Sequence, residues 1–344
     1  MVLNKKEEET LESIIVPSEQ DPNRPEFPPA SPHWPSTPIK KIIVPEFSNV
    51  YLKDESVNPT GTHKDRMAWE IIVIYRQLLM SKKRGIINKL PQMSIISSGS
   101  AANAIQIMLK KYGLPSLKVL VDHEMNAEVK RALEKIGCEL YETDLSKRPL
   151  ATDDILKLTD NLDGIDITSD DSLGPFDVFY DWMSYDIINQ DSDYVFIPYG
   201  TGHLYENIVN VAMGEMKSKS HDKRFSGDVK KLKRCSFIGA TTNNPNTKAD
   251  KLYSHYLPFV HFDNRWIKLA IKKGFIGPKS NVHIVQERFF GAALKVAERN
   301  NIDCEPSGIA GLALMIQMKN KLPKNKKMLI INTGKTKYML NSGK

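Results

Sequence analysis

Short apolar segments and helical segments alternate regularly between residues 92 and 141 of this 344-residue chain. Strands are predicted at residues 92–96, 117–121 and 138–141, and helices at residues 101–112 and 127–136. Gly137 is a stop signal at the end of the second helix. Strands and helices that alternate at this spacing indicate βαβ units, which build a parallel sheet through right-handed crossovers. The sequence therefore predicts an α/β fold.

The same alternation returns in the second half of the chain. Strands are predicted at residues 194–197, 235–240, 281–285 and 327–331, and helices around residues 182–189, 204–216, 287–298 and 308–318. We therefore expect two open twisted parallel-sheet domains. The smaller α/β domain takes residues 91–174, where the acidic stretch 151–172 should hold one more helix and a short edge strand. The larger domain takes residues 37–90 and 175–338.

Residues 1–36 differ in composition from the rest of the chain. Eight of the 20 prolines lie between Pro17 and Pro38, and large apolar residues are few. This composition predicts an extended N-terminal arm that is partly disordered or lies over the domain surface.

Composition also bears on the cellular compartment. No apolar run approaches the roughly 18 residues of a transmembrane helix, and the charged N-terminus lacks the apolar core of a signal peptide. The three cysteines, Cys138, Cys235 and Cys304, lie far apart without CxxC spacing, which indicates reduced thiols. We therefore expect a cytoplasmic protein without a membrane partner.

The net charge of +7 suits anionic ligands such as phosphates and carboxylates, although it could serve solubility alone. Residues 217–234 form a basic segment that could contact nucleic acid. However, Phe225 is its one side chain that could stack on a base. A solvated loop before a strand is the favoured interpretation, so we predict no nucleic-acid partner.

The stretch 49–66 combines a short strand, a turn and the start of a helix. Asn58-Pro59 and Gly61 are turn signals, and Thr62 is a plausible N-cap of the helix that begins at Lys64. A lysine in the first turn opposes the preference of the helix dipole for anions, so a specific reason for it is worth seeking. The positive helix end and Arg66 would favour the neutral, nucleophilic amine. Local chemistry alone favours an ordinary exposed lysine.

Two further segments lie where a predicted strand ends and a helix begins, which is where ligands gather in open α/β sheets. One is Ser97-Ser-Gly-Ser100, and the other is Gly200-Thr-Gly-His-Leu204. Backbone N–H groups at a helix N-terminus suit a carboxylate or a phosphate. Locally, a plain N-cap cluster explains the serines about as well, and a single Gly-x-Gly is weak evidence.

The segment Asn58-Pro-Thr-Gly-Thr-His-Lys64-Asp-Arg66, preceded by Lys53-Asp-Glu55, resembles the Schiff-base segment of one enzyme superfamily. This is the fold-type II, tryptophan-synthase-β-like superfamily of pyridoxal-phosphate enzymes, which includes cysteine synthase, threonine synthase and the serine/threonine dehydratases. Its typical form is Lys-x-Glu-x-x-Asn-Pro-Thr-Gly-Ser-x-Lys-Asp-Arg. The resemblance implies that pyridoxal 5′-phosphate lies in the cleft between the two domains and that Lys64 holds it as a Schiff base.

The same resemblance implies roles for the other segments. Gly200, Thr201, Gly202, His203 and Leu204 would bind the cofactor phosphate, with His203 in place of the usual last glycine. Thr333, in Asn332-Thr-Gly334, would face the pyridine nitrogen, and the segment Cys304-Glu-Pro-Ser-Gly308 resembles an element near the ring, although a plain helix start explains Glu305 equally well.

The Ser97-Ser-Gly-Ser100 segment is similar to the superfamily's Ser-Ser-Gly-Asn loop, which holds the substrate carboxylate and touches the 3′-oxygen of the cofactor. Ser97, Ser98, Gly99 and Ser100 would therefore bind the amino-acid substrate, and Ser100 would also be the cofactor contact. Ser100 replaces the usual Asn, which is the clearest departure from the pattern. Asn103, one turn later, is a weak substitute.

The resemblance implies an enzyme that acts on an amino acid by β-elimination or β-replacement through an aminoacrylate, with Lys64 as the catalytic base at Cα. A threonine-synthase-like γ-replacement is the alternative reaction. An alternative of another class is a divergent relative without activity that binds a partner. The histidines show no metal-ligand spacing, so no metal is predicted, and we expect a homodimer.

Overall fold

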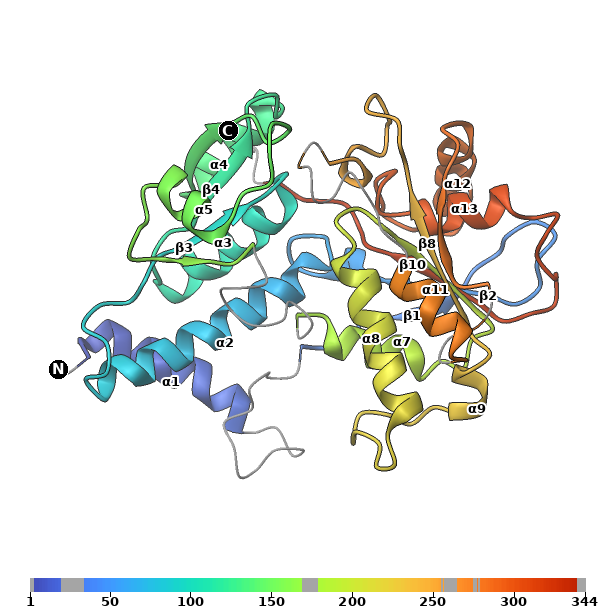
Figure 1. Ribbon diagram of the computed structural model, residues 1–344, viewed down its shortest axis with the longest axis horizontal. Coiled ribbons are helices and arrows are strands. Elements are labelled where there is room, and N and C mark those ends of the chain that lie inside the picture. The colour runs from blue at the N-terminus through green and yellow to red at the C-terminus, as the bar shows by residue number, and fades with distance from the viewer. Residues whose placement is uncertain are drawn as a thin grey trace. The chain divides into compact units, whose positions relative to one another are not determined.

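The computed structural model describes residues 3–19, 34–168, 179–254, 256, 265–274, 277 and 279–338. The chain folds into two compact units, whose elements are labelled in Figure 1. The first unit takes residues 1–35, 64–179 and 337–344, and the second takes residues 36–63 and 180–336.

The first unit contains a four-stranded parallel sheet in the order β5-β4-β3-β6. Its strands are β3 (Met93–Ile96), β4 (Lys118–Asp122), β5 (Glu139–Thr143) and β6 (Ile165–Asp166). Its helices are α1 (Lys5–Glu19), α2 (Lys64–Lys83), α3 (Ser100–Tyr112), α4 (Ala127–Ile136) and α5 (Thr152–Leu158). The end of α4 shows why the sequence pattern was informative: Gly137 adopts a left-handed φ of 106°, which a glycine tolerates best.

The second unit contains a six-stranded sheet in the order β1-β2-β10-β7-β8-β9, in which β1 alone is antiparallel to its neighbour. Its strands are β1 (Ile39–Lys41), β2 (Val50–Asp54), β7 (Tyr194–Pro198), β8 (Ser236–Thr241), β9 (Asn281–Ile284) and β10 (Met328–Asn332). Its α-helices are α7 (Asp181–Ile188), α8 (His203–Lys217), α9 (Val229–Leu232), α11 (Arg265–Lys272), α12 (Arg288–Arg299) and α13 (Ala310–Gln317). Short 3-10 helices lie at η1 (Glu55–Val57) and η3 (Asp250–Leu252).

Helices cover both faces of this larger sheet, as a parallel sheet requires. Phe196 and Ile238 lie in one core cluster with residues of α12 and α13. Their strand neighbours Val195 and Phe237 point to the opposite face, where they line a small space together with residues of α7 and α9. Successive residues of β7 and β8 are therefore buried on alternate sides, which explains why both strands are largely apolar.

The strand order places the last strand of the chain in the interior of the sheet. β10 lies between β2 and β7 and is parallel to both. The segments that follow β2, β10 and β7 therefore leave the same edge of the sheet at neighbouring positions. Such a point, where the strand order reverses, is the usual ligand site of an open α/β sheet.

The predicted α/β class and two parallel-sheet units are confirmed, including a helix and an edge strand within 151–172. The predicted extended arm is wrong for residues 5–19, which form α1. Leu11 and Ile14, three residues apart on one helix face, are buried there. Residues 20–33, which hold five of the eight prolines between Pro17 and Pro38, lie outside the described residues.

Further details differ from the sequence-based expectations. The helix α2 belongs to the first unit, not to the larger domain as the predicted range 37–90 implies, because it packs against α1 and α3. The basic segment 217–234 contains the short helix α9, which begins where Asp228 accepts a hydrogen bond from the backbone N–H of Lys230. The strand β1 and the helix α11 were not predicted.

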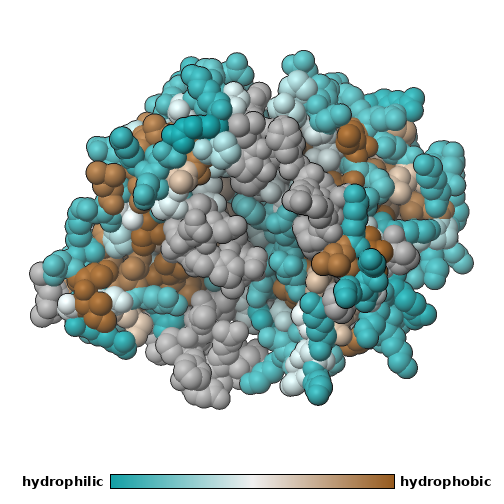
Figure 2. Space-filling model, in the orientation of Figure 1, coloured by the Kyte–Doolittle hydropathy of each residue, from teal (hydrophilic) through white to brown (hydrophobic). Residues whose placement is uncertain are grey.

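On the face drawn in Figure 2, hydrophilic residues predominate among those shown in colour, and apolar residues form scattered patches. The most exposed large apolar side chains in the described part of the chain include Ile43, Leu162 and Ile86. Of the helices within that part, none has the length and apolar character that crossing a bilayer requires.

Candidate active site

The turn after β2 is fixed by buried polar side chains. Glu55 is fully buried and accepts hydrogen bonds from the Thr37 hydroxyl at 2.5 Å and from the Asn58 amide at 2.8 Å. The Asn58 amide also donates to the carbonyl of Thr62 at 3.1 Å. Because buried polar groups need partners, these residues hold one another in place. The Glu55 and Asn58 positions of the motif thus shape the turn that leads to Lys64.

Three glycines bring distant chain segments into backbone contact in the second unit. A Cβ on Gly334, which has a φ of +95°, would lie 2.0 Å from the carbonyl oxygen of Gly61. A Cβ on Gly308 would lie 2.1 Å from the carbonyl oxygen of Gly334. The backbone N–H of Lys335 donates to Gly61 at 2.9 Å, and that of Thr333 donates to Gly308 at 3.0 Å. We call Gly61, Gly308 and the 333–334 segment the cofactor wall.

Thr333 stands at the carboxyl end of β10 within the cofactor wall. Its carbonyl accepts a hydrogen bond from the backbone N–H of His63 at 3.2 Å. Its hydroxyl is half-buried and makes no hydrogen bond to any residue in the described ranges. His63 is joined by a peptide bond to Lys64, the half-buried first residue of α2. The wall therefore fixes the chain immediately before the predicted Schiff-base lysine.

The predicted phosphate loop follows β7 and opens the 15-residue helix α8. Gly202 is the N-cap residue and has a left-handed φ of 94°. Because it is a glycine, no side chain caps the first N–H groups of α8. The first N–H groups of a helix lack partners within it and suit an anion. Thr201 is exposed, its hydroxyl lies 3.4 Å from Nδ1 of the half-buried His203, and Leu204 is buried. These donors fit a phosphate group.

A tyrosine and a carboxylate flank the same loop. A Cβ on Gly202 would lie 2.6 Å from the Tyr199 hydroxyl and 2.9 Å from Oε1 of Glu206. The Tyr199 hydroxyl donates to Glu206 at 3.0 Å. Burial, with the nearby negative charge of Glu206, raises the pKa of Tyr199 far above its usual range. The phenol therefore stays protonated and holds the Glu206 carboxylate.

Lys251, which was not predicted from the sequence, contacts the phosphate loop and the segments that border the cofactor wall. Its Nζ lies 2.6 Å from both carboxylate oxygens of Glu305, and its backbone N–H donates to the Ser307 hydroxyl at 3.1 Å. A Cβ on Gly200 would lie 2.6 Å from the Lys251 carbonyl oxygen. No local motif marks Lys251, because its partners are distant in the sequence and meet only through the sheet topology.

In the first unit, residues Ser97–Ser100 form what we call the carboxylate loop, between β3 and α3. The Ser97 hydroxyl accepts hydrogen bonds from the N–H groups of Gly99 at 3.0 Å and Ala102 at 3.3 Å. Ser97 is therefore engaged as an internal cap of the loop, which leaves its predicted contact with substrate a proposal. Ser98 is exposed, whereas Ser100 is 9% exposed and begins the 13-residue helix α3.

The end of the described chain covers the carboxylate loop within the same unit. A Cβ on Gly99, which has a φ of +121°, would lie 2.5 Å from the Tyr338 hydroxyl oxygen. The fully buried Asn103 donates weakly from Nδ2 to the Lys337 carbonyl at 3.5 Å. Among the described residues, the Asn103 Oδ1 atom has no partner. A buried acceptor without a donor costs about 1–3 kcal/mol, so this site suits a polar group from a ligand.

The described residues thus offer donors of the kinds that pyridoxal phosphate needs. In the second unit, the N-terminus of α8 and the Thr333 hydroxyl follow the carboxyl ends of the neighbouring strands β7 and β10. The Lys251–Glu305 pair lies beside them. In the first unit, Lys64 begins α2, and the carboxylate loop begins α3. In the second unit, the uncapped helix start and the half-buried hydroxyl fit a polar, anionic group. In the first unit, the unpartnered Asn103 oxygen suits a hydrogen-bond donor instead.

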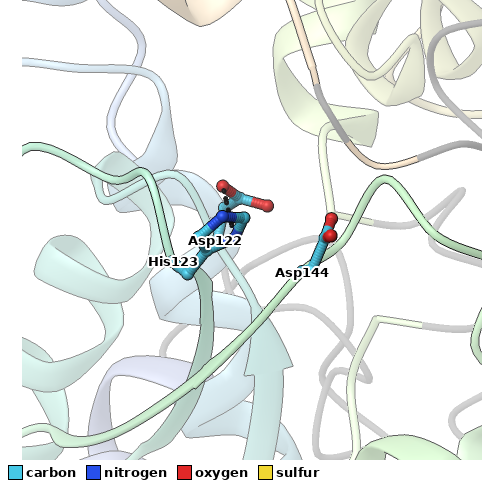
Figure 3. A group of neighbouring side chains, drawn as sticks. All are labelled: Asp122, His123 and Asp144. Carbon is cyan, nitrogen blue, oxygen red and sulfur yellow. Dashed lines mark ion pairs between the residues drawn. The ribbon is translucent and has the colours of Figure 1, made fainter.

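A separate cluster lies at the carboxyl ends of β4 and β5, where Asp122, His123 and Asp144 converge (Figure 3). The Asp122 carboxylate accepts hydrogen bonds from the N–H groups of Glu124 at 2.9 Å and Leu145 at 3.0 Å. Asp144 accepts from the backbone and hydroxyl of Ser146. These bonds fix the turns after both strands, which accounts for the two carboxylates.

Comparison with solved structures shows the same fold at low sequence identity. The O-acetylserine-dependent cystathionine β-synthase of Helicobacter pylori is 16% identical, with a TM-score of 0.61 over 90% of this chain and 95% of its own. Maize serine racemase is 14% identical, with a TM-score of 0.61 over 96% and 93%. A hydrogen sulfide-producing enzyme of Fusobacterium nucleatum is 17% identical, with a TM-score of 0.59 over 88% and 96%.

None of the curated proteins matches the chain by sequence. In contrast, residues 30–221 match a protein family, and this segment is more than half of the chain. The match includes Lys64, the carboxylate loop and the phosphate loop. It confirms the predicted cofactor and superfamily: the chain belongs to the family described as pyridoxal-phosphate dependent enzymes.

Proposed function

We propose that this protein catalyses β-elimination or β-replacement on an amino acid, with pyridoxal phosphate carried by Lys64. The observation that carries the proposal is the fixed approach to Lys64. The turn from Asn58 to His63 is locked by the Glu55 carboxylate and by the bond from His63 N–H to the Thr333 carbonyl. A lysine whose backbone is fixed at the end of that turn suits covalent attachment and proton transfer at one defined residue.

Each predicted segment then has a role in holding the cofactor. The phosphate would bind to the loop formed by Gly200, Thr201, Gly202, His203 and Leu204, at the N-terminus of α8. The Thr333 hydroxyl, which has no partner in the described ranges, would hydrogen-bond the ring nitrogen. When bound, pyridoxal phosphate acts as an electron sink that stabilises negative charge at the Cα of an amino acid.

The remaining steps belong to side chains and backbone of the chain. The amine of Lys64 would remove the proton from the substrate Cα and return it later. The N–H groups at the start of α3, with the Ser98 and Ser100 hydroxyls, would hold the substrate carboxylate. Support for β-chemistry comes from the names of similar structures, which include an O-acetylserine-dependent synthase and a hydrogen sulfide-producing enzyme. Both names fit substrates with a leaving group or a nucleophile at Cβ.

Chemical trapping tests the assignment directly. The protein is loaded with pyridoxal phosphate, reduced with borohydride and digested, and the modified peptide is identified by mass spectrometry. We expect the label on Lys64. Lys64→Ala should lose the label and at least ~10²-fold of activity, a typical contribution of one acid–base group. Lys83→Ala, an exposed change at the far end of α2, is the matched control and should retain both.

The reaction type is tested with a panel of amino acids. Release of a keto acid from L-serine or O-acetyl-L-serine, or capture of sulfide on Cβ, would support the proposal. Turnover of O-phosphohomoserine alone would instead identify a γ-replacement. Loaded protein whose absorption spectrum changes with none of these amino acids would contradict an enzymatic role and would favour a binding protein.

A further inference from the structure

Glu305 lies beside the residue that is proposed to face the ring nitrogen. Its backbone N–H donates to the carbonyl of Gly334 at 3.3 Å, and Gly334 directly follows Thr333. Glu305 therefore sits on the chain segment that borders the cofactor wall. A carboxylate near a pyridine nitrogen would favour the protonated ring, whereas a hydroxyl leaves it unprotonated.

The side-chain amine of Lys251 contacts both carboxylate oxygens of Glu305. Its Nζ lies 2.6 Å from each of the two oxygens and also donates to the Thr336 hydroxyl at 2.8 Å. About a fifth of each charged side chain is exposed, 19% for Lys251 and 20% for Glu305. A close, partly buried pair compensates both charges, and it fixes the direction in which the carboxylate points.

The backbone of Lys251 is held as firmly as its side chain. The backbone N–H of Lys251 donates a hydrogen bond to the Ser307 hydroxyl at 3.1 Å. The carbonyl oxygen of Lys251 packs so closely against Gly200 that a Cβ on Gly200 would lie 2.6 Å from it. Lys251 thus contacts the phosphate loop, the 305–307 segment and the segment after Thr333, all within the second unit. Its position is set by three elements and does not depend on its charge alone.

We propose that Lys251 is a positioning residue that sets reaction specificity, because it holds the Glu305 carboxylate and leaves the Thr333 hydroxyl as the partner of the ring nitrogen. This inference rests on the proposed function and extends it. An unprotonated ring is the weaker electron sink. Such a sink suits elimination of a good leaving group from Cβ, whereas a protonated ring, the stronger sink, promotes transamination as a side reaction.

The test reads the ring nitrogen itself. Four proteins are compared: wild type, Lys251→Met, Glu305→Gln and the double variant. Each is loaded with pyridoxal phosphate labelled with ¹⁵N in the ring, and the ¹⁵N chemical shift is measured at pH 7.5, roughly one unit above the usual pKa of histidine. We expect an unprotonated nitrogen in wild type and in Glu305→Gln. Lys251→Met should show a protonated nitrogen, because the released carboxylate can pair with it, and the double variant should return to the wild-type shift.

A matched control separates this effect from the loss of any ion pair. The Lys82–Glu7 pair has the same 2.6 Å separation and similar exposure, 15% and 17%, but it belongs to the first unit. Lys82→Met should leave the ring nitrogen unchanged. Lys251→Arg keeps the charge and should behave as wild type, which a merely structural effect of removing lysine would not predict.

A second measurement covers the case in which Lys251→Met binds the cofactor poorly. We expect its dissociation constant for pyridoxal phosphate to rise about tenfold, as for one partner removed from a partly buried pair. At saturating cofactor, the ratio of transamination to elimination of L-serine should rise in Lys251→Met and fall again in the double variant. An unprotonated ring in Lys251→Met, or a protonated ring in wild type, would overturn the inference. Failure of the label to attach to Lys64 would instead overturn the proposed function.

Discussion

The cofactor wall of the second unit and the carboxylate loop of the first unit are held by different kinds of contact. In the wall, backbone packs directly against backbone. A Cβ on Gly334 would lie 2.0 Å from a carbonyl oxygen, and one on Gly308 would lie 2.1 Å from another. In the carboxylate loop, a Cβ on Gly99 would meet the ends of side chains, Tyr338 at 2.5 Å and Val129 at 2.9 Å. Side-chain ends can move, whereas packed backbone cannot.

This difference matches the division of labour that we propose for the two regions. The wall carries residues that fit the superfamily pattern, such as Thr333, and would bind a cofactor that is the same in every member. The carboxylate loop carries the departure at Ser100 and is covered by the 337–338 segment. A region that binds a substrate which differs between members can adapt through substitution of side chains alone. The comparison therefore predicts a large penalty for changes in the wall and smaller, adjustable effects in the loop.

The largest effect is expected from Gly334→Ala. The new Cβ would collide with the Gly61 carbonyl, and the φ of +95° would be strained for alanine. We expect the free energy of unfolding to fall by about 3 kcal/mol or more, from strain and overpacking together. Urea denaturation measures the loss, and fluorescence titration with pyridoxal phosphate should show weaker binding.

Gly274→Ala is the control for Gly334→Ala, because Gly274 also has a positive φ, +70°, but no atom of the described residues lies within 4 Å of its Cβ position. It isolates the cost of the backbone conformation, about 1 kcal/mol. Equal losses for the two variants would show that the backbone contact in the wall contributes nothing, and the comparison would fail.

A smaller effect is expected from Asp54→Asn, next to the wall. Although burial opposes its charged form, hydrogen bonds from Lys40, Ser56 and Asn332 lower the pKa of Asp54 below its usual value. The stabilisation is therefore fully present above the pKa of the unfolded chain, near ~4, and is lost as pH falls through the folded value. Asp54→Asn should lower the free energy of unfolding by about 2 kcal/mol at pH 7.

The pH profile sharpens this prediction. Asp54→Asn should make the loss of stability between pH ~5 and ~2 shallower, because one linked carboxylate is gone. Asp144 in the first unit also has a lowered pKa, held by the hydrogen bond from Ser146, but its side chain is 26% exposed, against 4% for Asp54. Asp144→Asn should leave the free energy of unfolding nearly unchanged. Urea titrations at several pH values compare the two variants, and equal effects would contradict the assignment.

Gly99→Ala tests the carboxylate loop in the same way as Gly334→Ala tests the wall. We expect a loss of about 1–2 kcal/mol, mostly from the φ of +121°. Removal of the hydroxyl in Tyr338→Phe should recover part of that loss, with a coupling energy of about 0.5–1 kcal/mol. Purely additive losses in the double variant would show that the loop is as rigid as the wall.

The fold could be predicted from the sequence to a large extent because its central strands, such as β7 and β10, are apolar on both faces and several helices end at clear signals. The helix at residues 127–136 was predicted with its observed bounds for that reason. In α1, by contrast, the buried Leu11 and Ile14 lie among charged residues and close to many prolines. Composition pointed to an extended arm there, while packing against the folded unit decided for a helix.

The site was predictable only where a short segment carries its own signal. The turn before Lys64 and the glycines of the phosphate loop do so, because their conformations restrict the residue types. Lys251 and Tyr338 do not, because their partners lie far away in the sequence and meet them through strand order. The Ser97 hydroxyl illustrates the opposite problem, since the residue type suggests a ligand contact and the geometry uses it as a cap.

The smallest effect is expected from Ser100→Asn, which restores the usual residue of the superfamily. If Ser100 has adapted to a bulkier substrate, the longer side chain should crowd the loop and lower turnover of that substrate by less than about tenfold. If it is only a shortened Asn, turnover of common substrates such as O-acetyl-L-serine should rise. We expect the first outcome, because Asn103 and the 337–338 segment already bring polar groups to the loop, which leaves less room for another amide.

Keto acid release across one amino-acid panel distinguishes the outcomes, with Ser13→Asn as the matched control. Ser13 is an exposed serine of α1 in the same unit, outside the carboxylate loop, so the same added amide there should change nothing. A gain on common substrates with Ser100→Asn would count against an adapted loop and would leave only the wall as a region fitted to its ligand. An unchanged profile and spectrum in both variants would mean that the loop does not read the substrate at all, and the contrast between the two regions would then lie in their rigidity alone.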